Sequence, residues 1–572
     1  MGRALACLLL CAHAACGARA TPAPEGEEAR FHAEAEAFYW KHFEFRPHDA
    51  VELGQHRFDG RLPDRSAAGL AGEIERLHHA RTSFEAYDPT RLSPLASLER
   101  EILLNEIRGK LFDLEVRREP WRNPMFYSEE LDLSPYVIRP YAPVAERAKA
   151  LLSVCAEAPR YLAEARANLE KRLAVSFLDT AILQVKGHIE FARDDVPKAM
   201  VGLDAARAKE LTACMEDLAE ELSSFRDFLD SRHGEATADF ALGERGFLRM
   251  LEESQGVKAD FASLEKLAQA DLDRNLAAMA EAAKAIDPTH STREVVLAQA
   301  EDRLLGREML AEASKQAEAM RKFIVDKQIV SIPSDLVAEV RESPPFMRWN
   351  AAFLDPVGPF EAGRLTSFYY ISPPDPTWPP AEQKAYLIPR ADLLFTTIHE
   401  VWPGHFLQHL HIAKSPSPIV KSFCTYSTSE GWAHYVEEMM FEQGAGGGDP
   451  RAHIGQLKEA LLRNVRFVSA LGLHGRAMTV EYATRLFMEK GFVDAANARQ
   501  QAVRGTFDPM YLSYTVGKLI LRKLYADWKA KREAAGQPAR LKAFHDEVLS
   551  YGCAPLPVIR TRMLGPDAGP VL

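Results

Sequence analysis

Residues 396–405 read Thr-Thr-Ile-His-Glu-Val-Trp-Pro-Gly-His, and this stretch sets two histidines and a glutamate on a predicted helix. A hydrolytic metal site needs neutral imidazoles on one side of a helix and a carboxylate beside them that activates water. His399 and Glu400 fit this need, but His405 comes six residues after His399 rather than four. On a regular helix that spacing rotates the second histidine by roughly 240°. A bulge at the Pro-Gly pair before His405 would let the two histidines converge.

A second helix is predicted where residues 430–437 read Glu-Gly-Trp-Ala-His-Tyr-Val-Glu, after a serine- and threonine-rich segment suited to cap a helix. Glu430, His434 and Glu437 fall on one face of that helix. A carboxylate from a second helix is the usual third ligand when the first helix supplies two histidines. We therefore predict Glu430 as the third ligand, with His434 and His409 as the alternatives.

Most of the rest of the chain is predicted to be helical. Apolar residues recur at helical spacing in residues 28–115, where prolines and glycines interrupt the pattern. Residues 119–142 are rich in proline and aromatic residues, which suggests a packed irregular loop. Longer helical runs are predicted at 143–172, 203–232, 259–285, 293–329, 381–414, 428–443, 452–490 and 510–532.

Closely spaced prolines exclude a continuous helix across residues 332–390. Two segments there, 347–354 and 365–372, are short enough to be strands, and the second is rich in β-formers. We interpret the second segment either as an edge strand that binds an extended substrate or as part of a buried structural hairpin. Tyr369 and Tyr370 alternate in direction, so at most one of them should point into a cleft.

The first 20 residues have the pattern of a secretory signal peptide. A short basic start precedes an apolar run too short to span a bilayer, and Ala18-Arg19-Ala20 offers a cleavage site. The alternatives are lipoprotein processing at Cys16, which would add a lipid anchor, and an exposed N-terminal helix. No later segment has the roughly 20 apolar residues of a transmembrane helix. We expect an exported protein, periplasmic or secreted, or attached to the cell envelope by lipid.

Composition narrows the classes of function. The chain has 70 Lys and Arg against 81 Asp and Glu, a net charge of −11, which argues against a nucleic-acid partner. Four cysteines follow the leader, at 155, 214, 424 and 553, and none forms a C-x-x-C pair. Four cysteines allow three disulfide connectivities. We expect buried free thiols instead.

The motif at 399–408, His-Glu-x-x-Pro-Gly-His-x-x-Gln, and the Glu-Gly-Trp-Ala run at 430–433 closely resemble the domain-of-unknown-function 885 family. The resemblance continues at 472–474, Gly-Leu-His, and at 514–518, Tyr-Thr-Val-Gly-Lys. It covers most of the chain and is strongest over 390–520. Residues 508–511, Asp-Pro-Met-Tyr, differ from the Pro-Gly-Gln expected there. These bacterial proteins look like relatives of gluzincin metallopeptidases and are often exported.

The resemblance implies a mostly helical fold in which His399, His405 and Glu430 hold Zn²⁺, and it accounts for the Pro-Gly insertion. We therefore predict a mainly α, multi-helical metallopeptidase-like body with a small β-hairpin or sheet beside the metal helix. Residues 21–330 would form an N-terminal helical region, and residues 331–572 a catalytic helical region. Two histidines and a carboxylate suit zinc best, although manganese or cobalt could occupy such a site.

Roles follow from the chemistry of amide hydrolysis. Glu400 is predicted to be the general base rather than a surface carboxylate. Tyr514 and His474 are candidates for the donor that stabilises the oxyanion, although a tyrosine on a C-terminal helix is otherwise usually core packing. Arg504 could bind a substrate carboxylate, with a surface salt bridge as the alternative. Either Glu437 or Glu438 could orient a ligand imidazole, with an exposed acidic face as the alternative.

The leading hypothesis is therefore a zinc-dependent peptidase that acts on short peptides. A zinc-dependent hydrolase or lyase acting on a non-peptide substrate would use the same metal chemistry, and the sequence does not separate the two. An exported peptide- or metal-binding protein is the non-enzymatic alternative. The presence of Glu400 argues against it, because a binding site needs the ligands but not the base.

Overall fold

Capped helices make up most of the chain, of which the computed structural model describes residues 25–344, 347 and 351–572. The described fold is 70% helical, which confirms the prediction of a mainly α protein. Helices begin where polar side chains accept the free N–H groups of the first turn, as Ser66, Asp204 and Asp494 do. Ser291 and Glu294 form a reciprocal capping box at another start.

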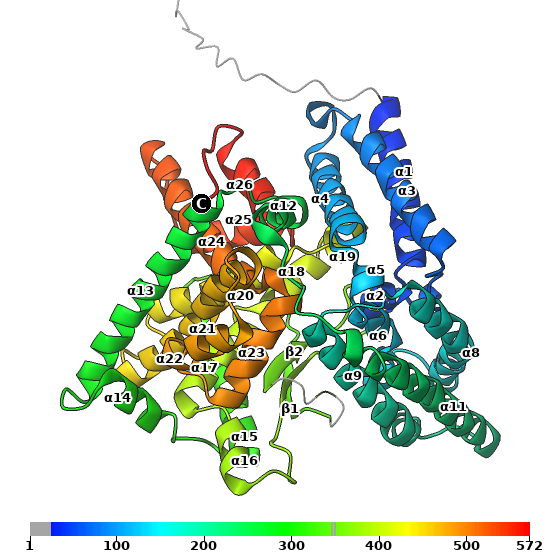
Figure 1. Cartoon of the computed structure of the whole chain (residues 1–572). Coiled ribbons are helices and arrows are strands. Elements are labelled where there is room, and N and C mark those ends of the chain that lie inside the picture. The colour runs from blue at the N-terminus through cyan, green and yellow to red at the C-terminus, as the bar shows by residue number, and fades with distance from the viewer. Residues whose placement is uncertain (1–24, 345–346, 348–350) are drawn as a thin grey trace, which may run out of the picture.

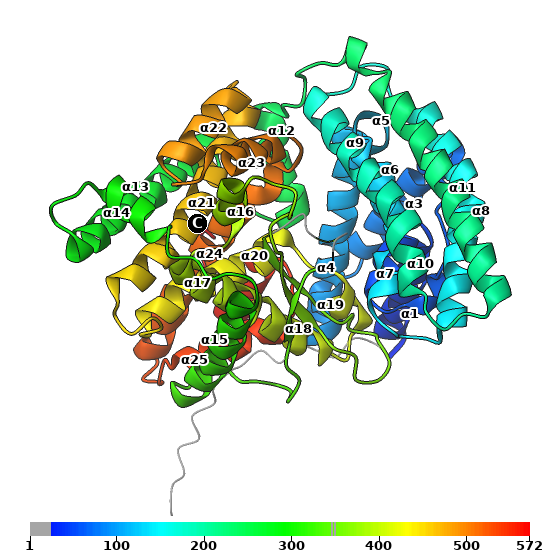
Figure 2. The ribbon, with the colours of Figure 1, turned by 90° about the horizontal axis from the view of Figure 1, so that it is seen from below.

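The helices gather in two groups, which Figures 1 and 2 show side by side from two directions. The first group contains α1 (Glu25–Glu44), α2 (Pro47–Glu52), α3 (Ala67–Glu85), α4 (Pro94–Leu111), α5 (Glu119–Arg122), α6 (Met125–Ser128), α7 (Ser134–Ile138), α8 (Val144–Asn168), α9 (Val175–Glu190), α10 (Val196–Ala199) and α11 (Ala205–Asp230). The segment 119–142, predicted to be an irregular loop, is made of the short helices α5, α6 and α7 and the turns between them.

The second group follows in the chain and contains the metal motif. Before the sheet come α12 (Gly243–Gln255), α13 (Phe261–Ile286), α14 (Thr292–Gln299) and α15 (Arg307–Asp326). After it come α16 (Pro380–Tyr386), α17 (Arg390–Glu400), α18 (His405–Ala413), α19 (Pro418–Ser422), α20 (Tyr426–Glu442), α21 (Pro450–Gly475), α22 (Val480–Glu489), α23 (Ala495–Phe507), α24 (Ser513–Ala534), α25 (Leu541–Ser550) and α26 (Leu556–Leu564). Helices α12–α15 precede residue 330 yet lie in this group (Figure 1), so the division into residues 21–330 and 331–572 stays a prediction about folding units.

A three-stranded sheet lies beside the metal helix, as predicted. It is built from β1 (Glu339–Glu342), β2 (Ala352–Asp355) and β3 (Phe368–Ile371) in the order β1-β3-β2. β1 runs parallel to β3, and β2 runs antiparallel to it. The interpretation of residues 365–372 as an edge strand was wrong, because β3 is hydrogen-bonded on both sides and fully buried. The missing neighbour is β1, whose Glu-Val-Arg-Glu sequence is too charged to predict a strand.

The helices that bear the site pack directly on one another. α17 contacts both α20 and α21, α20 runs against α24, and α21 also contacts α13. Buried apolar residues from both helix groups join one continuous core, from Phe31 to Met563. The helices that carry the candidate ligands therefore pack on a close-packed body.

Two disulfides cross-link the fold, which corrects the expectation of free thiols. Cys155 on α8 pairs with Cys214 on α11, and Cys424, just before α20, pairs with Cys553, just before α26. Their Cα atoms are 6.0 and 4.5 Å apart, distances that only the packing of these remote segments creates. Nothing in the sequence indicates that either pair of cysteines lies close together.

Two further expectations concern the membrane. The predicted leader, residues 1–20, and the lipidation candidate Cys16 lie outside the described residues. Within the described residues, no helix combines the length and apolar character needed to cross a bilayer.

Candidate metal centre

The break between α17 and α18 solves the spacing problem of the two histidines. α17 ends at Glu400, and α18 starts at His405, so the two histidines lie on separate helices. The turn is closed by a hydrogen bond of 3.0 Å from the Gly404 N–H to the Ile398 carbonyl. A Cβ atom at Gly404 would lie 1.7 Å from the His399 carbonyl oxygen, so the turn admits only glycine.

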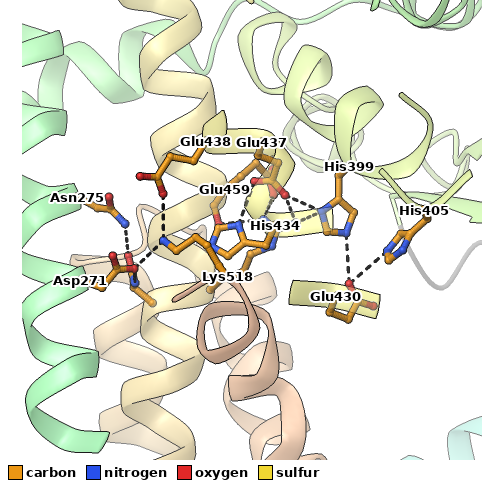
Figure 3. A network of polar contacts seen from close by, with 12 residues as sticks. Asp271, Asn275, His399, His405, Glu430, His434, Glu437, Glu438, Glu459 and Lys518 are labelled. Carbon is orange, nitrogen blue, oxygen red and sulfur yellow. Dashed lines mark hydrogen bonds and ion pairs between the residues drawn. The ribbon is translucent and has the colours of Figure 1, made fainter. Parts of the chain in front are cut away.

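The predicted ligands converge. His399 Nε2 lies 3.4 Å from Glu430 Oε2, and His405 Nε2 lies 3.3 Å from the same oxygen (Figure 3). One donor atom from each of the three residues lies within 4.8 Å of the others. The alternatives His409 and His434 do not belong to this cluster.

The geometry and chemistry of these donors fit zinc. Bonds of about 2.0–2.1 Å in a tetrahedral site would place neighbouring donors roughly 3.3–3.4 Å apart, the separations seen around Glu430. Glu430 Oε2 is buried and has no hydrogen-bond partner among the described residues. Burial alone would raise the pKa of Glu430, but His405 and His399 hold it well below its usual range. The two imidazoles therefore keep this oxygen anionic, as a ligand of a metal cation must be.

Glu437 is hydrogen-bonded to His399, the first candidate ligand. Its carboxylate accepts a hydrogen bond of 2.6 Å from His399 Nδ1 (Figure 3), which leaves Nε2 free to face Glu430 and His405. Burial and the Arg463 cation lower the pKa of His399, but contacts with Glu430 and Glu437 outweigh them and raise it to about 10. A metal cation would take the place of that proton.

Glu437 is itself completely buried and ion-paired with Arg463 at 3.3 Å. We expect Glu437→Gln to weaken zinc affinity about 10- to 100-fold, because the amide cannot hold the imidazole as strongly in the required tautomer. The measurement is competition for zinc with a chromogenic chelator. Glu438→Gln is the matched control: this neighbour binds Arg274 and Lys518 rather than a ligand, so zinc affinity should stay within about twofold. Equal losses in the two variants would contradict the orienting role.

A second buried network fixes the helices behind the ligands (Figure 3). The Lys518 ammonium on α24 is fully buried and lies 2.7 Å from Asp271 on α13 and 3.3 Å from Glu438 on α20. Asn464 on α21 donates to the same Asp271 carboxylate at 2.7 Å. Lys518, to which the sequence assigned no role, therefore joins four helices through paired charges and is structural.

Glu400 lies beside the ligands and faces the sheet. Its Oε2 accepts a hydrogen bond of 2.8 Å from the backbone N–H of Leu354 on β2, one of the two edge strands. Burial raises the pKa of Glu400, although His399 and His405 oppose this effect. A base whose pKa is moved toward neutrality is better matched to proton transfer near pH 7.

Tyr514 lies against the first ligand. Its ring is nearly parallel to that of His399, with centroids 6.2 Å apart. The position depends on a close crossing of α20 and α24, where a Cβ on Gly431 would lie 2.5 Å from the Gly517 Cα. Burial, and next the Glu430 carboxylate, raise the pKa of Tyr514, so the phenol keeps its proton and can act as a donor.

His474 is not brought to this cluster. Its Nε2 donates to the Gly505 carbonyl at 2.8 Å, and its Nδ1 accepts from the Leu242 N–H at 3.3 Å. Burial lowers its pKa to about 4, so the ring is neutral. With both nitrogens bonded to backbone, His474 has no free donor for an oxyanion, and its role here is to join α21 to neighbouring segments.

The two tyrosines predicted to bind substrate are engaged in contacts within the protein. Tyr369 is fully buried, with its hydroxyl 3.4 Å from Thr397 Oγ1. Tyr370 faces the other side of β3, as the alternation predicts, and packs against Phe353 and Phe368. Both tyrosines lie on the central strand of the sheet and on neither edge strand.

The Arg504 guanidinium is paired with Asp508 at 2.8 Å and also donates to the Tyr426 hydroxyl at 2.8 Å. The sequence analysis missed two other arginines, Arg463 and Arg466, which face Tyr514 from α21. Their spacing of three residues places them on one helical face, but nothing in a short motif distinguishes them from surface arginines.

A cavity of about 540 Å³ lies between parts of the two helix groups. Residues of both groups line it, among them Arg139 from the first group, and Leu354, Asp355 and His409 from the second. The cavity thus reaches β2, the strand that contacts Glu400. None of the lining residues is His399, Glu400, His405 or Glu430, so the cavity ends beside β2 rather than at the cluster itself.

Comparisons with known proteins agree with this fold. No curated protein matches the chain. A solved structure from Shewanella oneidensis, described as a "putative lipoprotein of unknown function", is 23% identical, covers 93% of this chain and 99% of its own, and has a TM-score of 0.77. A "putative lipoprotein" from Colwellia psychrerythraea is 16% identical, covers 94% of this chain and 98% of its own, and also has a TM-score of 0.77. The family described as "Bacterial protein of unknown function (DUF885)" matches residues 47–563, and the chain therefore belongs to that family.

Proposed function

We propose that the chain is an exported zinc-dependent peptidase that hydrolyses peptide bonds in short peptides. One observation carries the proposal: His399, His405 and Glu430 converge at zinc-like separations around a buried carboxylate oxygen that has no hydrogen-bond donor among the described residues. Glu400 follows directly after the first ligand. Metal ligands with a carboxylate base beside them are the arrangement of hydrolytic zinc sites rather than structural ones.

The residues divide the reaction between them. When bound, zinc would act as a Lewis acid that polarises the scissile carbonyl and lowers the pKa of water. Glu400 takes the proton from the attacking water and passes it to the leaving amine. Tyr514 donates a hydrogen bond to the oxyanion of the tetrahedral intermediate. Glu437 keeps His399 in the tautomer that the site needs.

The edge of the sheet beside Glu400 offers a place for the substrate backbone. The edge strand nearest Glu400 is β2, not β3 as the sequence suggested, and the Leu354 N–H points out of the sheet toward Glu400. An extended peptide can add to such an edge through main-chain hydrogen bonds. The cavity between the helix groups leads to this strand, which favours short peptides.

Export is supported by observations independent of the site. Both disulfides require an oxidising compartment to form and persist. Residues 1–20 have the pattern of a signal peptide, with Cys16 as a site for a lipid anchor. The two similar solved structures are each described as a "putative lipoprotein". We propose a periplasmic, secreted or envelope-anchored location on these grounds.

The first test is the metal content of the purified protein. We expect about one zinc per chain in the wild type and a loss of stoichiometric zinc in His399→Ala, because two donors alone bind zinc weakly. Elemental analysis after dialysis measures both. His290→Ala, which removes an exposed histidine far along the chain from the cluster, is the matched control and should retain zinc. No stoichiometric metal in the wild type, even after zinc is supplied, would exclude the proposal.

A further inference from the structure

Arg466 on α21 is a buried cation without a counter-ion. Only 7% of its surface is exposed. Its Nε donates to Gln501 Oε1 at 2.8 Å, but its two Nη atoms have no hydrogen-bond partner and no carboxylate in ion-pair range among the described residues. Arg463, one turn earlier, is by contrast paired with both Glu437 and Glu459. Burying a charge without a partner costs stability, so such a residue needs a reason to be retained.

Arg466 lies next to the metal centre. Its guanidinium is 4.9 Å from the centre of the Tyr514 ring, and that ring in turn lies 6.2 Å from the ring of His399. The nearby Arg504 is neutralised by Asp508, whereas Arg466 is not. Burial and the Arg504 cation lower the pKa of Arg466, the direction expected for positive charge in excess. An arginine nevertheless remains protonated in proteins, so this wall of the site is cationic.

We propose that Arg466 binds a carboxylate of the substrate and thereby selects peptides that carry one close to the scissile bond. This proposal rests on the proposed peptidase function and names its substrate class. The two free Nη atoms form a planar fork that matches a carboxylate in bidentate geometry. The free C-terminus of a short peptide and an acidic side chain are the two sources of that group.

The distances limit where the carboxylate can be. One extended residue spans about 3.5 Å. Ring distances of 4.9 and 6.2 Å therefore place the Arg466 guanidinium no more than about three residues from the metal ligands. If the C-terminus supplies the group, the enzyme removes one to a few residues from the end of a peptide. Arg504, the arginine that the sequence suggested for this role, is already occupied.

Three peptides of equal length test the proposal on the zinc-loaded protein: acetyl-tetraalanine, its C-terminal amide, and an amide with aspartate as the last residue. We expect kcat/KM for the free acid to exceed that for the plain amide about 10- to 100-fold, the range for a charge-assisted hydrogen bond. Arg466→Met should lower the free-acid value to that of the amide. A purely structural role would slow the acid and the amide alike and leave their ratio intact.

The third peptide identifies the source of the carboxylate. Cleavage of the aspartyl amide as fast as the free acid would assign the site to acidic side chains as well, and slow cleavage would assign it to the C-terminus. Arg466→Lys keeps the charge but loses the fork, and should retain part of the preference. Arg476→Met removes an exposed arginine at the end of α21 that is paired with Glu244 and Glu265, and should retain all of it.

A binding measurement separates this proposal from the peptidase proposal. Calorimetry with metal-free Glu400→Gln protein excludes both turnover and carboxylate binding by zinc. We expect acetyl-tetraalanine to bind at least about 10-fold tighter than its amide, and Arg466→Met in the same background to remove that difference. If no peptide is hydrolysed but the difference is present, the carboxylate site stands and the peptidase function fails. Equal binding of acid and amide, or a preference that survives in Arg466→Met, would overturn the carboxylate site.

Discussion

Glu400→Gln is expected to lower peptide turnover by about 10³-fold or more while one zinc per chain is still bound. An amide has no basic site for a proton, so water is no longer activated, but all three ligands remain. The glutamine oxygen can still accept the hydrogen bond from the Leu354 N–H, so β2 should keep its position. Steady-state hydrolysis of a short peptide, with zinc measured on the same sample, gives the result.

A matched control makes this result specific. Glu442→Gln changes an exposed carboxylate on α20 that is paired with Arg522, and should leave turnover within about twofold. If Glu400→Gln kept its zinc and also its turnover, Glu400 would not be the base, and the mechanism would be wrong. A protein that binds zinc but hydrolyses no peptide even in its wild-type form would instead favour a non-peptide substrate or a binding function.

Tyr514→Phe is expected to reduce kcat about 10²- to 10³-fold with little change in KM, the usual cost of removing one oxyanion donor. The substitution removes only the hydroxyl, so the ring can still stack on His399 and receive the guanidinium groups of Arg463 and Arg466. Folding and zinc content should therefore be unchanged. Because burial raises the pKa of Tyr514, the hydroxyl that is lost is a protonated donor.

Tyr511→Phe serves as the control for Tyr514. Tyr511 is fully buried in the turn before α24, and its hydroxyl lies against Gly505 rather than at the metal cluster. We expect kcat to stay within a few-fold of the wild-type value, since no oxyanion donor is removed. Equal losses in the two variants would mean that the Tyr514 hydroxyl acts through packing rather than in the transition state.

The sequence alone was sufficient to predict the fold class and the three residues of the proposed metal cluster. Helical periodicity and capping are local properties, so the mainly α fold could be predicted from windows of a dozen residues. His399, Glu400 and His405 lie within seven consecutive positions. Glu430 lies on the predicted face of one further helix. The structure brings the three proposed ligands together as predicted. The local pattern did not determine the backbone conformation between the two histidines. In the structure, this segment is a break between two helices.

Features that depend on residues far apart in the sequence were decided by the tertiary structure. β3 proved to be a central strand because the charged β1 pairs with it, and the four cysteines became two disulfides because distant segments pack together. His474 lost its predicted role because the backbone occupies both its ring nitrogens.

The arginines of α21 show the physical reason most clearly. Arg463 and Arg466 are alike in sequence, three residues apart on one helix face. Folding places Glu437 and Glu459 beside the first and no described carboxylate beside the second. Whether an arginine is neutralised depends on which carboxylates the fold places beside it. The order of residues along the chain does not reveal those neighbours.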